Sequence, residues 1–445
     1  MSAPRFFRGE WVEPGEDGFD AAGAVFNSRL QRRPTVVARC RGAADVVAAL
    51  AHARENGLEI AVRCTGMSLA GYSATDGMVI DLSLMRGVRI DPESRTAWIE
   101  GGARAGDMQI EASRYGLAAV TGMLSGIGVG LILGGGTGSL SRRAGYASDN
   151  VLAVEMVTAA GEVVTASPDE NPDLYWGVRG TTGNFGVVTA LQLRLHEVPP
   201  RVVAGSLVWR GERVRPALLA VKDAIDQTSD YFSLVTVIND GDLEAWICHT
   251  GPTETAEADV RELIDAIPPD QDDLVRDSFV GITSLFDAGY PPQRVIHDQE
   301  SVRDLDDGVI DALVEATAEP LPEGSTARRV VELPPRRGAL AGAAPSPSAL
   351  HAGEIGPHWR IGPGVWWSDP AEDDVHDDWL RRLMARIRES DERMGLLDPS
   401  HVGVDLTEEQ IAAIYPDGRY DRLRRLKAEW DPDNVFHSNL NIPPA

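Results

Sequence analysis

One Gly-rich stretch, residues 121–150, limits what this chain can fold into more than any other part of the sequence. Its glycines gather in two groups, Gly122–Gly130 and Gly134–Gly138, with an apolar piece between them. Glycine has no Cβ and tolerates positive φ, so such segments form tight turns and let a ligand approach the backbone. Successive N–H groups in these turns form concave anion sites suited to a pyrophosphate. The stretch is not a Walker A loop, and close packing in a twisted sheet explains it as well as a ligand loop does.

The bulk composition narrows the class of protein. The 445 residues are enough for two or three domains, and the formal net charge of −26 argues against nucleic-acid and anionic-membrane partners. Three cysteines, Cys40, Cys64 and Cys248, form no disulfide framework and fit a reducing compartment. The first residues lack the apolar region of a secretory signal, and no apolar run reaches the ~18 residues of a membrane span. We therefore expect a cytoplasmic protein, with no metal site and an oligomeric state that the sequence does not define.

The order of the expected elements predicts an α+β protein. Strand-like and helical runs alternate up to about residue 200, where a Pro-Pro pair closes the first part. Beyond it, strand runs at 206–209, 232–239 and 244–249 alternate with amphipathic helices, which favours an antiparallel sheet covered by helices. We expect three parts: 1–200, 201–405 and a C-terminal return at 406–445.

Five motifs, spread over more than 350 residues of the sequence, carry a resemblance to a known family. They are Val62–Gly71 (VRCTGMSLAG), Gly130–Gly138 (GLILGGGTG), Tyr146–Asn150 (YASDN), Trp176–Val188 (WGVRGTTGNFGVV), and Trp430–Phe436 (WDPDNVF) with Asn441–Pro444 (NIPP). With these motifs in this order the chain resembles the berberine-bridge-enzyme-like flavoproteins, which belong to the vanillyl-alcohol-oxidase group of FAD-linked oxidases.

The resemblance implies a PCMH-type FAD-binding domain of two α+β subdomains at 1–200. It also implies a substrate domain whose antiparallel sheet lies over the flavin at 201–405, and a last segment that returns to the FAD domain. The first motif should wrap the pyrophosphate, and the Gly-rich groups should follow the rest of the cofactor. The residues expected to contact FAD are Arg63, Cys64, Thr65, Gly66, Met67, Ser68, Gly122, Met123, Ser125, Gly126, Gly128, Val129, Gly130, Gly134, Gly135, Gly138, Asn150, Gly183, Val187 and Asn441.

The sequence departs from the family pattern at both places of covalent flavin attachment. Met67 stands where most relatives have a histidine bonded to the flavin, and Met123 stands where some add a cysteine. A thioether makes neither bond. Cys64 is a conceivable substitute, although a cysteine beside a strand is more often a small buried apolar residue. We expect FAD to be bound non-covalently.

The catalytic base is the least defined part of the site. Thr137 occupies the place of a catalytic tyrosine in some relatives. Tyr415 is the remaining candidate and serves equally well as a structural residue, and Tyr72 is a weaker candidate; a phenol with a pKa near 10 would need help as a base. Four further residues of the second part stand where strands could face the flavin: His351, His358, Trp366 and Trp367.

Three functions follow from the resemblance. The first is an FAD-dependent oxidoreductase, an oxidase or dehydrogenase, that acts on a small secondary metabolite with O2 as one candidate acceptor. The second is an FAD-dependent cyclase without net redox change, of the decalin-forming [4+2] type in polyketide biosynthesis, which the loss of the linkage residues favours. The third is a resistance protein that binds a drug.

Overall fold

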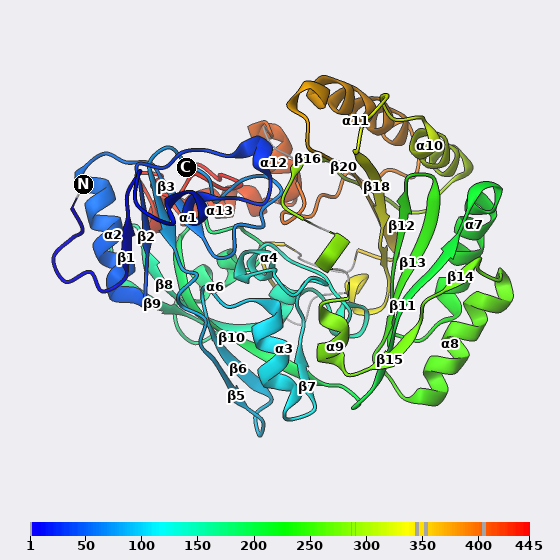
Figure 1. Cartoon of the computed structure of the whole chain (residues 1–445). Helices are drawn as coiled ribbons and strands as arrows, with labels where there is room; N and C mark the ends of the chain where they lie inside the picture. Colours follow the sequence, from blue (N-terminus) through cyan, green and yellow to red (C-terminus); the bar gives the residue numbers. More distant parts are fainter. Residues whose placement is uncertain (1, 286, 290, 343–346, 351–354, 403–405) are drawn as a thin grey trace.

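The structure is a computed structural model, and it describes residues 2–285, 287–289, 291–342, 347–350, 355–402 and 406–445. Two small sheets with their helices form one half of the molecule, and a large sheet forms the other half (Figure 1). This mixed arrangement of helices and sheets is the predicted α+β class.

The first sheet has the strand order β1-β2-β4-β3, in which β2, β4 and β3 run parallel. The helix between β2 and β3 provides the crossover that parallel strands need. Its strands and helices are β1 (Glu10–Val12), α1 (Phe19–Gly23), β2 (Val36–Arg39), α2 (Ala43–Glu55), β3 (Ile60–Arg63) and β4 (Met78–Asp81). The motif that begins at Val62 therefore leaves the carboxyl end of a parallel strand, where ligand loops of α/β units are found.

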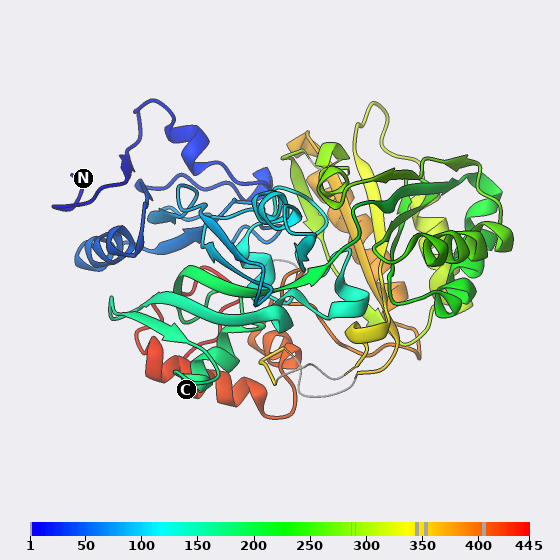
Figure 2. The same ribbon diagram turned by 90° about the horizontal axis from the view of Figure 1, so that it is seen from below.

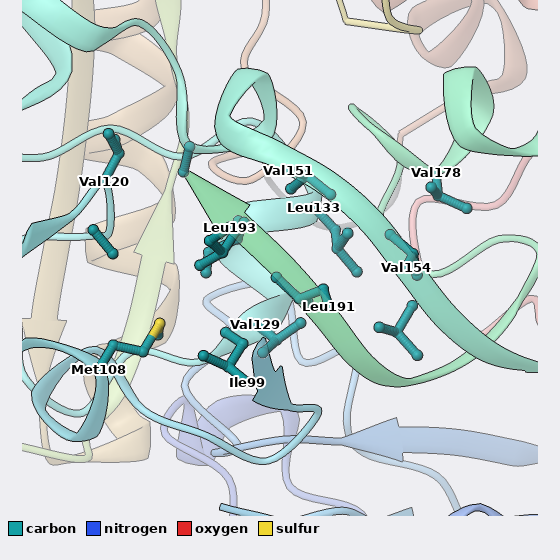
Figure 3. Close-up of a cluster of buried hydrophobic side chains, with 14 of the residues drawn as sticks. Ile99, Met108, Val120, Val129, Leu133, Val151, Val154, Val178, Leu191 and Leu193 are labelled. Carbon is teal, nitrogen blue, oxygen red and sulfur yellow. The ribbon is translucent and has the colours of Figure 1, made fainter. Parts of the chain in front are cut away.

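The second sheet has the order β5-β6-β10-β8-β9, with β7 paired to the far end of β10. Its elements are β5 (Val88–Asp91), β6 (Thr96–Glu100), α3 (Ala105–Ser113), β7 (Leu117–Ala119), α4 (Val129–Leu133), α5 (Ser141–Ala144), β8 (Val151–Thr158), β9 (Val163–Ala166), α6 (Pro172–Val178) and β10 (Gly186–Glu197). Figure 3 shows Val129 and Leu133 of α4 beside Leu191 and Leu193 of β10 in one apolar cluster. The apolar piece between the two glycine groups is thus buried in the core, and the glycines on either side of it form the turns.

The third sheet is antiparallel, with the main strand order β14-β11-β13-β12-β18-β20-β16. Its strands are β11 (Val202–Trp209), β12 (Phe232–Asn239), β13 (Asp242–His249), β14 (Gln271–Asp272), β15 (Val275–Asp277), β16 (Arg294–His297), β17 (Glu300–Val302), β18 (Arg328–Leu333), β19 (Pro335–Arg336) and β20 (His358–Trp367). Its helices are α7 (Val214–Ala224), α8 (Thr253–Ala266), α9 (Phe279–Thr283), α10 (Asp307–Ala318) and α11 (Asp373–Ile387). Helices α7, α8, α10 and α11 cover the outer face, so the inner face is turned toward the first half (Figure 1).

A buried arginine connects the two halves. Arg142 of α5 donates hydrogen bonds to the backbone carbonyls of Ile225, Thr228 and Phe232 and to the Thr228 hydroxyl. Burial lowers the pKa of this guanidinium, and nearby aspartates, Asp230 first among them, counter the effect. Because these bonds reach from the Gly-rich region to the third sheet, they help fix the distance between them.

The last two helices, α12 (Glu408–Ile414) and α13 (Arg419–Trp430), leave the third sheet and return to the first half. Figure 2 shows this orange and red segment beside the teal strands of the second sheet. The predicted division at residues 200 and 405 is compatible with this path and stays a prediction. In the described ranges, helices long and apolar enough to cross a membrane are absent.

A buried ion pair holds the C-terminal return in place. Lys427 of α13 is fully buried and donates to Asp431 at 2.7 Å and to the carbonyls of Asn184 and Phe436 at 2.6 and 2.8 Å. The ammonium therefore links α13, the end of motif Trp176–Val188 and the last motif.

Replacement of Lys427 by methionine should lower the free energy of unfolding by about 3–5 kcal/mol, because the buried Asp431 carboxylate loses its partner. Lys222→Met is the matched control, since Lys222 pairs with the half-exposed Asp304; an exposed pair is worth about 1 kcal/mol or less. Denaturant midpoints of the two variants measure the difference, and equal midpoints would contradict the assigned role of Lys427.

Candidate active site

A cavity of about 340 Å³ lies between the first half and the inner face of the third sheet. Small-molecule sites typically have volumes of about 300–1,000 Å³ and are mostly apolar with a few convergent polar groups. The wall toward the first half comes mainly from the first Gly-rich group and the 64–73 segment, with Thr137 from the second group, and the opposite wall comes from β12, β13, β16, β18 and β20.

The structure brings many of the predicted residues together at this cavity. Those that line it are Cys64, Thr65, Gly66, Met67, Ser68, Tyr72, Gly122, Met123, Gly128, Val129, Gly130 and Gly183. Those that lie outside its lining are Arg63, Ser125, Gly126, Gly134, Gly135, Gly138, Asn150, Val187, Asn441 and Tyr415.

Several of the outlying residues support the lining from behind. Ser125 bonds to Asp287 through its N–H at 2.9 Å and through its hydroxyl. The Asn150 amide donates to two carbonyls of the preceding turn, both at 2.9 Å. A Cβ on Gly138 would lie 1.9 Å from the Thr121 carbonyl oxygen, so only glycine permits the second tight turn.

Two predicted residues are replaced at the cavity by near neighbours. On β10 the side chain of Val187 belongs to the core beneath the first sheet, whereas Val188 lines the cavity. Successive side chains of a strand point to opposite faces, so an offset of one residue changes the side. At the C-terminus Asn439, not Asn441, lines the cavity.

The turn that follows β3 lines the cavity with four residues whose backbone N–H groups have no acceptor among the described residues. They are Thr65, Gly66, Met67 and Ser68, of which Gly66 is buried and the other three are half-buried; backbone N–H groups away from water normally have an acceptor. Gly66 adopts a φ of 75° and gives its carbonyl to the Phe26 N–H at 2.8 Å. Consecutive N–H groups without acceptors fit an anionic group such as a cofactor pyrophosphate.

Two further observations fit a bound dinucleotide. The Oδ1 atom of Asn439 is buried without a partner in the described chain, while its amide nitrogen donates to Gly183 and Phe436. A Cβ on Gly128 would lie 2.3 Å from the Cys64 sulfur, so the Gly-rich segment and the turn after β3 touch only because Gly128 lacks a side chain.

The opposite wall contains a polar cluster that the sequence analysis did not identify. Glu332 of β18 accepts a hydrogen bond from Arg360 Nη2 of β20 at 2.8 Å, and His297 of β16 lies beside them in the lining. The ring centroids of His297 and His401 are 6.3 Å apart. The signal in the sequence was the alternation on β20: Trp359, Ile361, Val365 and Trp367 face the helix-side core, so Arg360 and Trp366 face the cavity.

The charges of this cluster follow from its burial. Burial alone would raise the pKa of Glu332, but Arg360 and the two histidines lower it below its usual value. Burial, with the positive charge of Arg360, lowers the pKa of His297 to about 3. At neutral pH the cavity therefore presents a carboxylate, a guanidinium and a neutral imidazole within one wall.

The two candidate tyrosines and Thr137 lie in different surroundings. Tyr72 lines the cavity and burial raises its pKa. Tyr415 is buried away from the lining, where its hydroxyl donates to the Gly180 carbonyl at 2.9 Å and burial raises its pKa. Thr137 lines the cavity and accepts a hydrogen bond from Arg336 at 3.3 Å.

Of the four second-part candidates, only Trp366 is part of the cavity lining. Trp367 faces the helices and donates to Asp373 at 2.9 Å. His358 bonds to the Gly356 carbonyl at 2.9 Å and lies outside the lining. His351 falls outside the described residues.

Comparison with known proteins decides the family. Residues 34–167 match the family described as "FAD binding domain", and residues 405–443 match "Berberine and berberine like". (R)-6-hydroxynicotine oxidase of Paenarthrobacter nicotinovorans is 32% identical over 469 aligned residues, which cover 100% of this chain and 98% of that protein. The chain belongs to the berberine-like family of FAD-linked oxidases. It is an FAD-linked oxidoreductase, as predicted.

Solved structures agree with this family assignment. The crystal structure of 6-hydroxy-D-nicotine oxidase from Arthrobacter nicotinovorans superimposes with a TM-score of 0.90 at 30% identity over 100% of both chains. Aclacinomycin oxidoreductase superimposes with a TM-score of 0.84 at 25% identity over 98% of this chain and 99% of the other. The predicted PCMH-type fold is confirmed by these similarities.

In this FAD-linked oxidoreductase three sulfur-bearing side chains line the cavity: Cys64, Met67 and Met123. Burial raises the pKa of the Cys64 thiol to about 12, and a protonated thiol is a poor nucleophile. Met67 belongs to an apolar cluster with Phe26, Leu69 and Trp366, so its thioether contacts the wall of the third sheet. In the described residues no group of three or more His, Cys, Asp or Glu side chains is arranged to hold a metal ion.

Gly128→Ala should weaken FAD binding by about tenfold or more. The added Cβ displaces Cys64 or Thr65 and with them the turn that lines the cavity; overpacking of this kind costs about 1–3 kcal/mol. Gly23→Ala is the control, because its Cβ makes only ordinary 3.5 Å contacts with Pro34. Fluorescence titration of flavin-free protein with FAD measures both constants, and unchanged affinity in Gly128→Ala would disprove the assigned contact.

Proposed function

We propose that this oxidoreductase binds FAD without a covalent bond and oxidises a small, largely apolar molecule by removal of a hydride. The observation that carries the non-covalent part is the position of Met67: the residue at the expected linkage site lines the cavity, and it is a thioether. The predicted residues in the lining, together with Val188 and Asn439, are proposed to hold the cofactor. The names of two of the more similar relatives specify small molecules, hydroxynicotine and aclacinomycin, which supports a small substrate here, although a more distant relative is named xylooligosaccharide oxidase.

The shape of the opposite wall supports an apolar, ring-containing substrate. Phe26, Leu69, Val235, Trp246 and Trp366 pack in one cluster and line the cavity. Aromatic side chains bury large areas and favour stacked or edge-on contacts with rings. A flat substrate between this wall and the flavin position would make such contacts on one face.

FAD, when bound, supplies the two-electron acceptor for the hydride. The chain itself must orient the substrate and take up the proton released from its O–H or N–H group. We propose Glu332 as the proton acceptor, because it is half-buried in the lining, ionised at neutral pH and held by Arg360 at 2.8 Å. Tyr72 is the second candidate: it also lines the cavity, but its raised pKa makes it a donor rather than an acceptor near neutral pH.

Other parts of the proposal rest on the sequence alone. The net charge of −26 supports a protein without nucleic-acid or anionic-membrane partners. We propose O2 as one electron acceptor and the cytoplasm as the location. Met67 and Met123, whose thioethers make the cyclase a candidate, line the cavity, and the named activities of the similar proteins support oxidation.

Acid precipitation of the purified holoenzyme should leave the yellow chromophore in the supernatant as intact FAD, because no side chain tethers it. The same treatment of Met67→His tests the position itself: if the site is equivalent to the linkage site of relatives, part of the flavin should stay with the precipitate. Flavin that stays attached to the wild-type precipitate would overturn the proposal.

Glu332→Gln should lower the rate of flavin bleaching by a screened substrate by about 100-fold or more, because the proton loses its acceptor while the shape of the site is kept. Glu300→Gln is the matched control: Glu300 is buried and also ion-paired, to Arg393 at 2.7 Å, but it lies outside the cavity lining. Anaerobic stopped-flow absorbance measures the rate. Equal rates in the two variants would exclude Glu332 as the proton acceptor.

A further inference from the structure

The polar wall contains more hydrogen-bond donors than proton transfer requires. Arg360 and His297 are 4% and 8% exposed, and both line the cavity. Arg360 uses Nη2 for Glu332, while its Nε and Nη1 atoms are buried without partners in the described chain. Neither ring nitrogen of His297 makes a hydrogen bond of normal geometry with the described residues. Buried donors without acceptors are costly, so their place in a ligand cavity points to a group that the ligand brings.

A glycine on the same strand makes room for these donors. Arg360, Gly362, Gly364 and Trp366 alternate along the cavity face of β20. A Cβ on Gly362 would lie 2.6 Å from Arg360 Nη1 and 3.2 Å from His297 Nε2. The guanidinium and the imidazole therefore lie together over the bare backbone of Gly362. We call Arg360, His297 and Gly362 the Arg360 corner.

The charges around the Arg360 corner are balanced. Arg360 faces Glu332, and the buried Arg336 lies 3.5 Å from the carboxylate of Asp398, while His297 is neutral at physiological pH. The neighbouring carboxylate of Glu332 would repel a second anion at this place. The unpartnered N–H groups instead suit a strong but uncharged acceptor.

We propose that the Arg360 corner binds a neutral carbonyl oxygen of the substrate, such as that of a ketone, lactam or amide. The proposal rests on the proposed function, since it assigns a substrate class to the same cavity. The carbonyl lies at Arg360 and His297, and the apolar ring system lies along Trp246, Val235 and Trp366. This orientation places the atoms next to the carbonyl beside Glu332.

Three matched probes test the proposal on the holoenzyme without turnover. Quinolin-2-one has a bicyclic body with a neutral carbonyl, naphthalene has a similar body without oxygen, and 2-naphthoate carries a carboxylate. We expect quinolin-2-one to bind about tenfold or more tightly than either of the others, as followed by the flavin difference spectrum and by calorimetry. Tighter binding of 2-naphthoate, or equal binding of quinolin-2-one and naphthalene, would overturn the proposal.

Two glycine variants locate the effect. Gly362→Ala pushes the Arg360 guanidinium aside without a change of charge, and Gly364→Ala, two residues further along the strand, places its Cβ 2.9 Å from the Trp366 ring instead. Gly362→Ala should abolish the preference for quinolin-2-one over naphthalene. Gly364→Ala should weaken both probes alike and keep the preference. Loss of the preference in Gly364→Ala, with the preference kept in Gly362→Ala, would place the carbonyl in another part of the cavity and refute the proposal.

A second pair of variants removes the donor itself. Arg360→Met in a Glu332→Gln background leaves no unpaired buried carboxylate, and Glu332→Gln alone is its reference. The double variant should lose the carbonyl preference that the single variant keeps; if both keep it, Arg360 is not the donor. If the double variant keeps the carbonyl preference while Glu332→Gln still reduces the flavin slowly, the Arg360 corner is refuted and the proposed function stands. If the double variant loses the preference while Glu332→Gln reduces the flavin at the normal rate, the Arg360 corner stands and Glu332 is not the proton acceptor.

Discussion

The contact between the turn after β3 and the Gly-rich segment is the constraint on which the active-site half depends. The two segments meet where Gly128 faces Cys64, and a single Cβ at Gly128 would come within 2.3 Å of the sulfur. Because the segments touch, residues 65–68 and the three glycines Gly122, Gly128 and Gly130 line one cavity. An acidic chain can in this way bind a diphosphate without lysines, since the main chain supplies the donors.

In the third sheet, successive side chains of a strand point alternately to the helix-covered core and to the cavity. On β20 the odd-numbered aromatic and aliphatic side chains fill the core under the helices, and even-numbered residues form the cavity wall. Both faces of β20 are covered, so its side chains are apolar on the face toward the helices, while the face toward the cavity also carries the polar Arg360. The bare backbone at Gly362 and Gly364 is the physical reason that two long side chains, Arg360 and Trp366, fit flat against the same strand.

How much the sequence could predict follows from how local each feature is. Glycine turns are local, so the motifs alone selected residues such as Gly66, Gly122 and Gly128, which the fold brings to one cavity. Registers are less local: the resemblance places Val187 and Val188 together, but only Val188 lines the cavity, since one residue along a strand changes the face. The cluster of Glu332, Arg360 and His297 comes from three strands whose pairing depends on the whole sheet, so the alternation on β20 can mark Arg360 but not its partners on β16 and β18. Tyr415 shows the converse, because a motif-derived residue has a buried hydroxyl bonded to the Gly180 carbonyl.

Met67 packs at the boundary between the two halves of the molecule. At this position a side chain that bonds to the flavin would belong to the first half alone, whereas the thioether packs with Trp366 and Val295 of the third sheet and Phe26 of the N-terminal segment. Its contribution is therefore apolar burial across the boundary between the halves by a half-buried side chain. Cofactor retention in such a protein depends on how closely the third sheet stays against the Gly-rich segment. The buried bonds of Arg142, which join α5 to the carbonyls of residues 225, 228 and 232, act on that same distance. With FAD bound non-covalently, as proposed, cofactor binding and the packing of the two halves are linked, so that tighter packing of the substrate wall also holds the cofactor more firmly.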